Sequence, residues 1–294
     1  MLKKQFMVAA AATVLSTAAF ASDHGHAASH DSHHDAMHAE HGGSAPACTG
    51  FGPQTPRDID SKHGENRIVF ALAADYKEMN LCNIHLHKNA EHKAKDYPIF
   101  AGEGAHGYDS GYQCSMSKHL SAAEMAPTAE PVCPSEHGAL KPGDTIEVHW
   151  VHSSAPVKPG PTLGSCLSDN VKNPDLRVEA QVFTLVNDPN ALDFNTMGYT
   201  GKVVNGYQQA DAIPANTGKP VLFAGSTTGP SYSDSTCSPL QVTWSVRPSC
   251  AKIDINSVAK WCKGNAFKED HAHGVRKLVT VPALLSEIKD GQKH

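Results

Sequence analysis

Short apolar or alternating runs separated by turn residues recur along most of the chain. Six runs have the length and β-branched content of strands: RIVFALAA (67–74), CNIHLHK (82–88), TIEVHWVH (145–152), RVEAQVFTLV (177–186), PVLFAGST (220–227) and QVTWSV (241–246). Clusters such as KPGD and NDPN lie between them and are typical of turns. The pattern predicts a β-rich chain, mainly β with few short helices.

Two segments depart from this strand pattern. VPALLSEIKD (281–290) has a Pro near its start and predicts one late helix. Residues 96–141 contain Gly and Pro but no clear strand, so we expect a long excursion tied down by disulfides.

The first 46 residues differ in composition from the rest. A basic start, a short apolar run and Ala19-Phe20-Ala21 before Ser22 describe a secretory signal peptide over residues 1–21. The apolar run is too short to favour a permanent membrane span. Residues 22–46 hold seven histidines and almost no large apolar side chain, which predicts a disordered His-rich tail. This tail is either a loose binder of divalent metal or a solvated leader, and the sequence leaves both open.

Cysteine usage and charge limit the location and the partners. All eight cysteines follow the apolar leader, and an even count in an exported chain indicates disulfides. We expect local bridges within the close pairs Cys114/Cys133 and Cys250/Cys262, and a periplasmic or secreted location. The formal net charge of −5 and the lack of a basic block exclude nucleic acid and anionic membrane as favoured partners. The oligomeric state is open, with a homodimer as one alternative.

Two of the predicted strands carry histidines in positions that suit a metal. Side chains two apart on a strand share a face, so His85 and His87 converge, and so do Glu147 and His149. Three neutral imidazoles with a fourth position open to water are typical of catalytic zinc. Glu147 is placed to orient an imidazole. His92 is an alternative to His149 as the third ligand.

Four pieces of the sequence, HLHKNAEHK, EVHWVH, AGSTTGP and QVTW, resemble the carbonic anhydrases. The run NLCNIHLHKNAEHK (80–93) is most similar to the delta class, and the order of the pieces also resembles the alpha class. This resemblance implies a single carbonic-anhydrase-like catalytic domain over residues 47–294, built on a large, mostly antiparallel sheet. It implies a lyase with Zn²⁺ that converts CO2 reversibly to bicarbonate and a proton by zinc-bound hydroxide.

The resemblance also implies roles for individual residues. His85, His87 and His149 match the zinc ligands, and Glu147 matches the glutamate that orients the third histidine. Thr227 matches the threonine that accepts from hydroxide and donates to a buried glutamate, here Glu91. Thr228 is expected to line the substrate pocket. Two features depart from the alpha pattern: a longer gap between the second and third ligands, and a threonine loop one residue shorter.

Other functions fit parts of the same pattern. His85, His87 and Glu91 also fit the H-x-H-x3-E spacing of a cupin-type metalloprotein, which would use iron or manganese. The His-rich tail suggests a periplasmic zinc-binding or carrier protein. If the chain is a carbonic anhydrase, it also needs a proton-transfer histidine near the cavity mouth. The candidates are His63, His106, His119 and His152.

Overall fold

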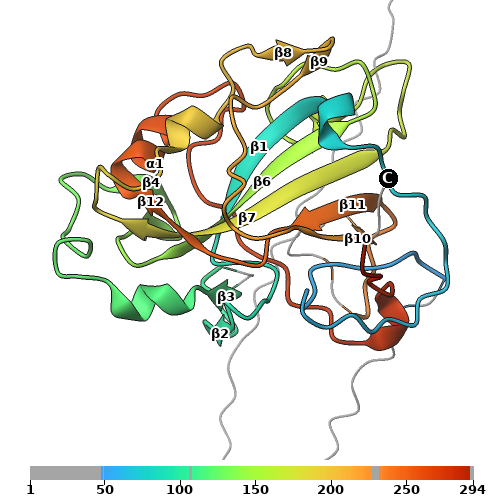
Figure 1. Ribbon diagram of the computed structural model, residues 1–294, viewed down its shortest axis with the longest axis horizontal. Coiled ribbons are helices and arrows are strands. Elements are labelled where there is room, and N and C mark those ends of the chain that lie inside the picture. The colour runs from blue at the N-terminus through green and yellow to red at the C-terminus, as the bar shows by residue number, and fades with distance from the viewer. Residues whose placement is uncertain (1–47, 49, 106–107, 227–231, 233, 292–294) are drawn as a thin grey trace, which may run out of the picture. The chain divides into compact units, whose positions relative to one another are not determined.

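The computed structural model describes residues 48, 50–105, 108–226, 232 and 234–291. Its centre is one six-stranded sheet with the path β1-β6-β7-β11-β10, and β12 pairs with β7 beside this path (Figure 1). The strands are β1 (Asn80–Lys88), β6 (Thr145–Ser153), β7 (Leu176–Val186), β10 (Val221–Ser226), β11 (Gln241–Val246) and β12 (Ala251–Asp254). The pairs β1/β6, β6/β7 and β10/β11 are antiparallel, whereas β11 and β12 run parallel to β7. The β-rich prediction is confirmed.

Five of the six predicted runs form strands of this sheet, and one does not. The segment 67–74 has no strand, although its residues are β-branched and apolar. The backbone amide of Ala73 donates instead to the side-chain Oγ1 of Thr243, at 2.8 Å. Val69 is 91 % exposed, so the segment does not bury the alternate residues that would favour a strand.

The helix predicted at 281–290 is wrong. Only η5 (Pro282–Leu284), a single 3-10 turn, forms there. Backbone carbonyls of this segment accept from the amides of residues 54, 65 and 66, and the bonds within the segment are the two i to i+3 bonds of this single turn. The α-helix is α1 (Ile255–Cys262), where the Asp254 side chain accepts from the Asn256 amide as an N-cap.

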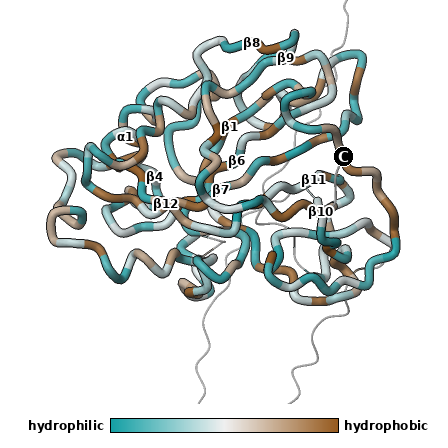
Figure 2. The backbone as a smooth tube through the Cα atoms, viewed as in Figure 1, coloured by the Kyte–Doolittle hydropathy of each residue, from teal (hydrophilic) through white to brown (hydrophobic). Residues whose placement is uncertain are grey.

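The sheet buries both faces. One face packs Ile84, Leu86, Val148, Trp150 and Phe183 against α1 in the first core. The other face carries a second apolar cluster that includes Val151, Val178, Val182, Val242 and Trp244. Apolar positions recur along β1, β6 and β7 between polar ones, as the hydropathy colouring shows (Figure 2). His85 and His87 of β1 and His149 of β6 lie on the second face, beside Val151, Val178, Val242 and Trp244.

Short elements complete the fold. The excursion after β1 contains β2 (Ile99–Phe100), β3 (Tyr112–Gln113), β4 (Val132–Ser135), β5 (Gly138–Leu140) and the turn η2 (Ser115–His119). The other small elements are η1 (Tyr76–Glu78), η3 (Leu163–Cys166), η4 (Phe194–Met197), β8 (Val203–Val204) and β9 (Tyr207–Gln208). Contacts group Ala45–His294 into one compact unit. The predicted signal peptide and His-rich tail lie outside the described residues.

All eight cysteines form disulfides, and the two expected local pairs are wrong. The bridges are Cys48–Cys237, Cys82–Cys166, Cys114–Cys250 and Cys133–Cys262. The excursion is tied to the core and not to itself, because Cys133 on β4 packs against α1 and meets Cys262 there. Four disulfides indicate an oxidising compartment. None of the helices in the described part of the chain is long and apolar enough to cross a bilayer.

Candidate metal centre

Strands β1 and β6 bring the three predicted histidines together. In their antiparallel register His85 lies opposite His149, and His87 lies opposite Glu147. A register shift between Leu81 and Asn83 precedes these pairs, so residues 83, 85 and 87 alternate onto one face. The ring centroid of His149 lies 5.0 Å from that of His85 and 4.7 Å from that of His87. One nitrogen from each of the three rings lies within 4.8 Å of the other two.

The tautomer of His85 follows from its neighbour Asn83. The Asn83 amide nitrogen donates to the Gly160 carbonyl at 3.2 Å, which leaves the amide oxygen as an acceptor. That oxygen lies 2.7 Å from Nδ1 of His85. Nδ1 therefore carries the proton, and Nε2 of His85 presents a lone pair.

Each of the other two rings also contacts a protein group on the side facing away from the cluster. Nδ1 of His87 donates to the Gly274 carbonyl at 2.9 Å, so its Nε2 presents a lone pair. Nε2 of His149 lies 3.2 Å from Oε1 of Glu147, close enough for an electrostatic contact although the angle is not that of a hydrogen bond. Nδ1 of His149 lies 3.2 Å from Nε2 of His85.

This donor set fits a zinc ion. Two lone-pair nitrogens facing each other at 3.2 Å repel unless a proton or a cation lies between them. Burial lowers the pKa of His85 well below its usual value and lowers that of His87 to about 4, which disfavours the proton. Neutral imidazole nitrogens anchored through their second nitrogen are typical zinc ligands. The three histidines lie on β1 and β6, the first two strands of the sheet path, which Figure 1 shows side by side.

Glu147 is the centre of the hydrogen bonding behind the histidines. Its Oε2 accepts from the backbone amides of Glu91 and His92, at 2.6 and 3.3 Å. Its Oε1 accepts from Nδ1 of His92 at 2.8 Å. Burial raises the pKa of this carboxyl, but His92 and His149 outweigh burial and hold it well below the usual value. Glu147 is therefore an anionic acceptor for the histidines around it.

His92 supports this carboxylate. β1 ends at Lys88 and Asn89 follows with a positive φ of 63°, so His92 leaves the strand before it reaches the cluster. Its Nε2 lies 3.1 Å from Oγ1 of Thr55, and its Nδ1 is bound to Glu147. Glu91, His92 and His149 do form a second group that is close enough to hold a metal. Both ring nitrogens of His92 are engaged by the protein, however, which favours His149 over His92 as a ligand.

Glu91 lies on the other side of His87 and is 1 % exposed. Its Oε1 lies 3.8 Å from Nδ1 of His87 and accepts from the Arg276 amide at 3.3 Å. The nitrogen of His87 that it approaches is the one facing away from the other imidazoles. Thr227 and Thr228 lie outside the described residues, directly after the end of β10 at Ser226.

An apolar cavity opens beside the imidazoles. It has a volume of about 50 Å³ and is lined by His85, His87, His149, Val151, Leu163, Leu176, Val178, Val242 and Trp244. A larger cavity of about 280 Å³ shares Leu176 and Val242 with it but contains none of the histidines. The smaller cavity is the one next to the metal-binding atoms, and its size suits a small apolar molecule.

The sequence reasoning missed several members of this site. Gly274 holds His87, and the neighbouring His273 lies 5.7 and 5.9 Å, between ring centroids, from His85 and His87. A hydrogen bond that His273 donates to the Glu269 carboxylate raises the pKa of His273. The H-A-H spacing at 271–273 was the available signal, but it occurs more than 180 residues after β1.

The predicted proton-transfer candidates lie elsewhere or are not described. His152 lies on the face of β6 opposite to His149, and it is fully buried because that face of the sheet is also covered. His63 pairs with Glu65 at the surface, at 3.1 Å. His119 ends η2 in the excursion, and His106 lies outside the described residues.

Comparison with known proteins identifies the family. The family model described as delta carbonic anhydrase matches residues 76–257, which is more than half of the chain. The chain belongs to the delta carbonic anhydrase family. No curated protein matches this carbonic anhydrase.

Solved structures of alpha-carbonic anhydrases are also similar to it. One from Thermovibrio ammonificans, in complex with the inhibitor sulfanilamide, is 16% identical, with a TM-score of 0.27 over 77% of this chain and 84% of that chain. One from Photobacterium profundum is 19% identical, with a TM-score of 0.26 over 79% of this chain and 88% of that chain. At these scores neither structure assigns a role to any residue here.

Proposed function

We propose that this carbonic anhydrase is zinc-dependent and that His85, His87 and His149 hold the ion. The observation that carries the proposal is the set of three converging imidazoles: hydrogen bonds at Nδ1 orient His85 and His87, and His149 contacts the Glu147 carboxylate on its far side. Bound zinc supplies the Lewis acidity that makes water a nucleophile near neutral pH, for which carbonic anhydrase is the standard example. A set of neutral imidazoles leaves the full charge of the ion available for this purpose.

The protein's own residues position the reaction. Glu147 keeps His149 oriented and is itself fixed by His92 and two backbone amides. The apolar wall of the small cavity, with Val151, Val178 and Val242, holds CO2 next to the imidazoles and excludes competing water. Bicarbonate is charged and polar, so the same wall favours its release.

The threonine loop completes the proposed site. Thr227 accepts a hydrogen bond from the nucleophile and donates a hydrogen bond from its own hydroxyl to the Glu91 carboxylate. This pair of hydrogen bonds aims a lone pair of the nucleophile at the carbon of CO2. Thr228 lines the pocket on the same side. The position of Ser226 at the end of β10 supports this arrangement, because Arg276 connects Ser226 to Glu91. The Arg276 guanidinium donates to Oγ of Ser226, and the Arg276 backbone amide donates to Glu91.

The cupin alternative is less well supported. A cupin would use Glu91 as a ligand together with His85 and His87. The Glu91 carboxylate approaches Nδ1 of His87, the nitrogen already committed to the Gly274 carbonyl. Among the described residues, the group with Glu91 that could hold a metal combines it with His92 and His149, and not with the H-x-H pair.

Metal analysis with stopped-flow CO2 hydration tests the function. We expect one tightly held zinc per chain after deletion of residues 22–46, loss of activity on chelation, and recovery when zinc is added back. Iron or manganese in the site would favour the cupin, and several loosely held zinc ions would favour the carrier. A zinc-loaded protein without CO2 hydration activity would refute the proposal.

We further propose that residues 1–21 are cleaved during export to the periplasm or the exterior and that residues 47–294 form the mature catalytic domain. Four disulfides among the described residues support export. The N-terminal sequence of the mature protein, which we expect to begin at Ser22, tests this proposal.

A further inference from the structure

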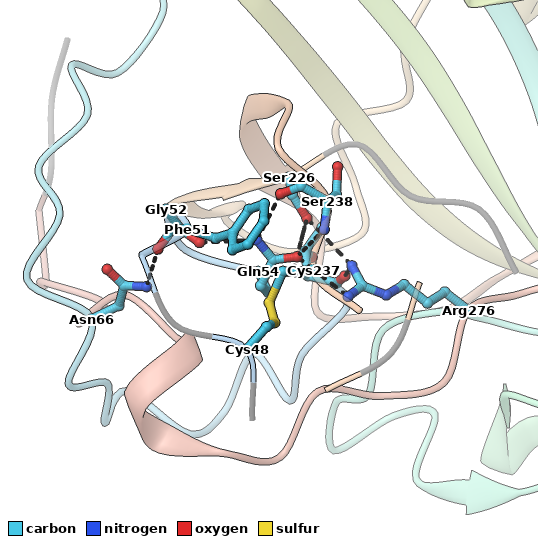
Figure 3. The surroundings of a disulfide bond; sticks show 10 residues. Cys48, Phe51, Gly52, Gln54, Asn66, Ser226, Cys237, Ser238 and Arg276 are labelled. Atoms are coloured by element: carbon cyan, nitrogen blue, oxygen red, sulfur yellow. Dashed lines mark hydrogen bonds between the residues drawn. A yellow bond between two sulfur atoms is a disulfide. The ribbon is translucent and has the colours of Figure 1, made fainter. Parts of the chain in front are cut away.

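The amide of Gln54 holds one end of the segment that joins β10 to β11. The Gln54 side chain is fully buried, and its Nε2 donates to the carbonyls of Gly52 and Ser238, at 2.9 and 3.0 Å. Its Oε1 accepts from the backbone amide of Ser238 at 2.9 Å. Figure 3 shows these bonds beside the Cys48–Cys237 disulfide. Gln54 therefore binds both backbone groups of Ser238, directly after Cys237.

The same residue reaches the other end of that segment. Oγ of Ser226, the last residue of β10, donates to Oε1 of Gln54 at 3.4 Å. The Ser226 hydroxyl also accepts from the backbone amide of Thr55 at 3.3 Å. Gln54 and its neighbour Thr55 thus contact Ser226, the last residue of β10, and Gln54 also contacts Ser238, three residues before the start of β11.

We call the contacts of Gln54 with Ser226 and Ser238 the clamp, and Arg276 connects this clamp to Glu91, next to the proposed metal ligands. Its guanidinium donates to Oε1 of Gln54 at 3.3 Å, to Oγ of Ser226 at 3.4 Å and to the Thr55 carbonyl. Its backbone amide donates to Glu91. Arg276 is 1 % exposed, so its charge strengthens these bonds in a region of low dielectric. A displacement of Gln54 would therefore disturb both the loop ends and the contact to Glu91.

We propose that Gln54 is a positioning residue that fixes Ser226 and Ser238, on either side of the connection between β10 and β11, relative to Glu91. Its effect on turnover rests on the roles proposed above for Thr227 and Thr228, which follow Ser226 in the sequence. The Gln54 side chain contacts Ser226, Ser238 and Arg276 through both its amide nitrogen and its amide oxygen. Because misplacement of a reacting group by about 1 Å can cost on the order of 100-fold in rate, a clamp remote from the metal can control turnover.

The test compares Gln54→Met with the matched control Ser238→Ala. Methionine keeps the length of the side chain but neither donates to nor accepts from Ser238. Ser238→Ala leaves the clamp intact, because Gln54 binds the backbone of Ser238, whereas the Ser238 hydroxyl accepts from the Leu240 amide, at 3.3 Å. Zinc content, kcat/KM for CO2 per zinc-loaded chain and hydrogen–deuterium exchange of residues 232–240 are measured well below the unfolding temperature.

We expect Gln54→Met to keep its zinc, to lose on the order of 10- to 100-fold in kcat/KM, and to exchange faster over residues 232–240. Ser238→Ala should match the wild type in all three. Unchanged kcat/KM in Gln54→Met, unchanged exchange, or an activity loss that only follows zinc loss would each overturn the inference. If Gln54→Met does not fold, Ser226→Ala, which removes one arm of the clamp, is held to the same criteria. A wild type without CO2 hydration would refute the proposed function instead, and the exchange measurement would still test the clamp.

Discussion

Glu147 and His92 form a fully buried pair, with Nδ1 of His92 2.8 Å from Oε1 of Glu147. The same Oε1 lies 3.2 Å from Nε2 of His149. One carboxylate oxygen thus contacts two imidazoles, one facing the proposed metal and one facing away from it. The pair explains why His92, which follows the end of β1, supports the Glu147 carboxylate, whereas His149 is free to bind the proposed metal.

Glu147→Gln tests this support. The amide has no negative charge to stabilise the N–H of His149, so zinc affinity should fall by about 10- to 100-fold. Competition with a chelator of known affinity measures the change. Glu179→Gln is the matched control, because Glu179 is also a buried strand carboxylate but pairs with Arg177 on the opposite face. Equal zinc affinities in the two variants would contradict the role of Glu147.

Val151→Phe tests the CO2 wall. A phenyl ring at Val151 fills the cavity of about 50 Å³ beside the imidazoles, so kcat/KM should fall on the order of 100-fold. Zinc content should not change, because Val151 makes none of the contacts that orient the histidines. Val148→Ala, on the opposite face of the same strand, is expected to cost stability and leave kcat/KM unchanged. An active Val151→Phe enzyme would place the CO2 site elsewhere.

The burial of His152 predicts that the free energy of unfolding depends on pH, independently of metal binding. Burial lowers its pKa to about 3, below the usual 6.5, so the unfolded state binds the proton more tightly. Its contribution is complete above pH 6.5 and is lost as the pH falls from 6.5 towards 3. At pH 5 the loss is about 2 kcal/mol.

Denaturant unfolding of the metal-free protein at pH 7 and pH 5 measures this loss. His152→Gln does not titrate in this range and should lose about 2 kcal/mol less than the wild type between the two pH values. Parallel losses in both proteins would show that His152 is protonated in the folded state.

Asn83→Leu tests how the tautomer of His85 is fixed. Leucine cannot accept from Nδ1 of His85, so the ring loses the partner that directs Nε2 towards the other imidazoles. Zinc affinity should fall by about 10- to 100-fold, measured by the same chelator competition. Asn80→Leu is a control near the start of the same strand, since Asn80 donates to Ala155 and not to a histidine. A normal zinc affinity in Asn83→Leu would mean that His85 needs no such anchor.

The local part of the site could be predicted from the sequence. The strand period of two places His85 beside His87 and Glu147 beside His149, and pairing of β1 with β6 then brings the two sets together. The same period would have found Asn83, which is two residues before His85. Strand content was equally readable, because five of the six runs enter the sheet.

The remaining features depend on contacts that are distant in sequence. Gly274 and His273 reach β1 through an isolated bridge between His87 and His273. Two of the four disulfides join the excursion to the C-terminal part of the chain, over 136 and 129 residues, so proximity in sequence gave the wrong pairs. The helix predicted at 281–290 is limited to one turn because the amides of residues 54, 65 and 66 donate to three of its backbone carbonyls.

The most direct test of the proposed site is stopped-flow CO2 hydration by the wild type, His149→Ala and His92→Ala, with the zinc content of each. We predict that the wild type is active and that His149→Ala loses both zinc and nearly all activity. His92→Ala should keep a weakened zinc site and part of the activity, because it loses only the support of Glu147. An active, zinc-loaded His149→Ala protein would contradict the proposed ligand set.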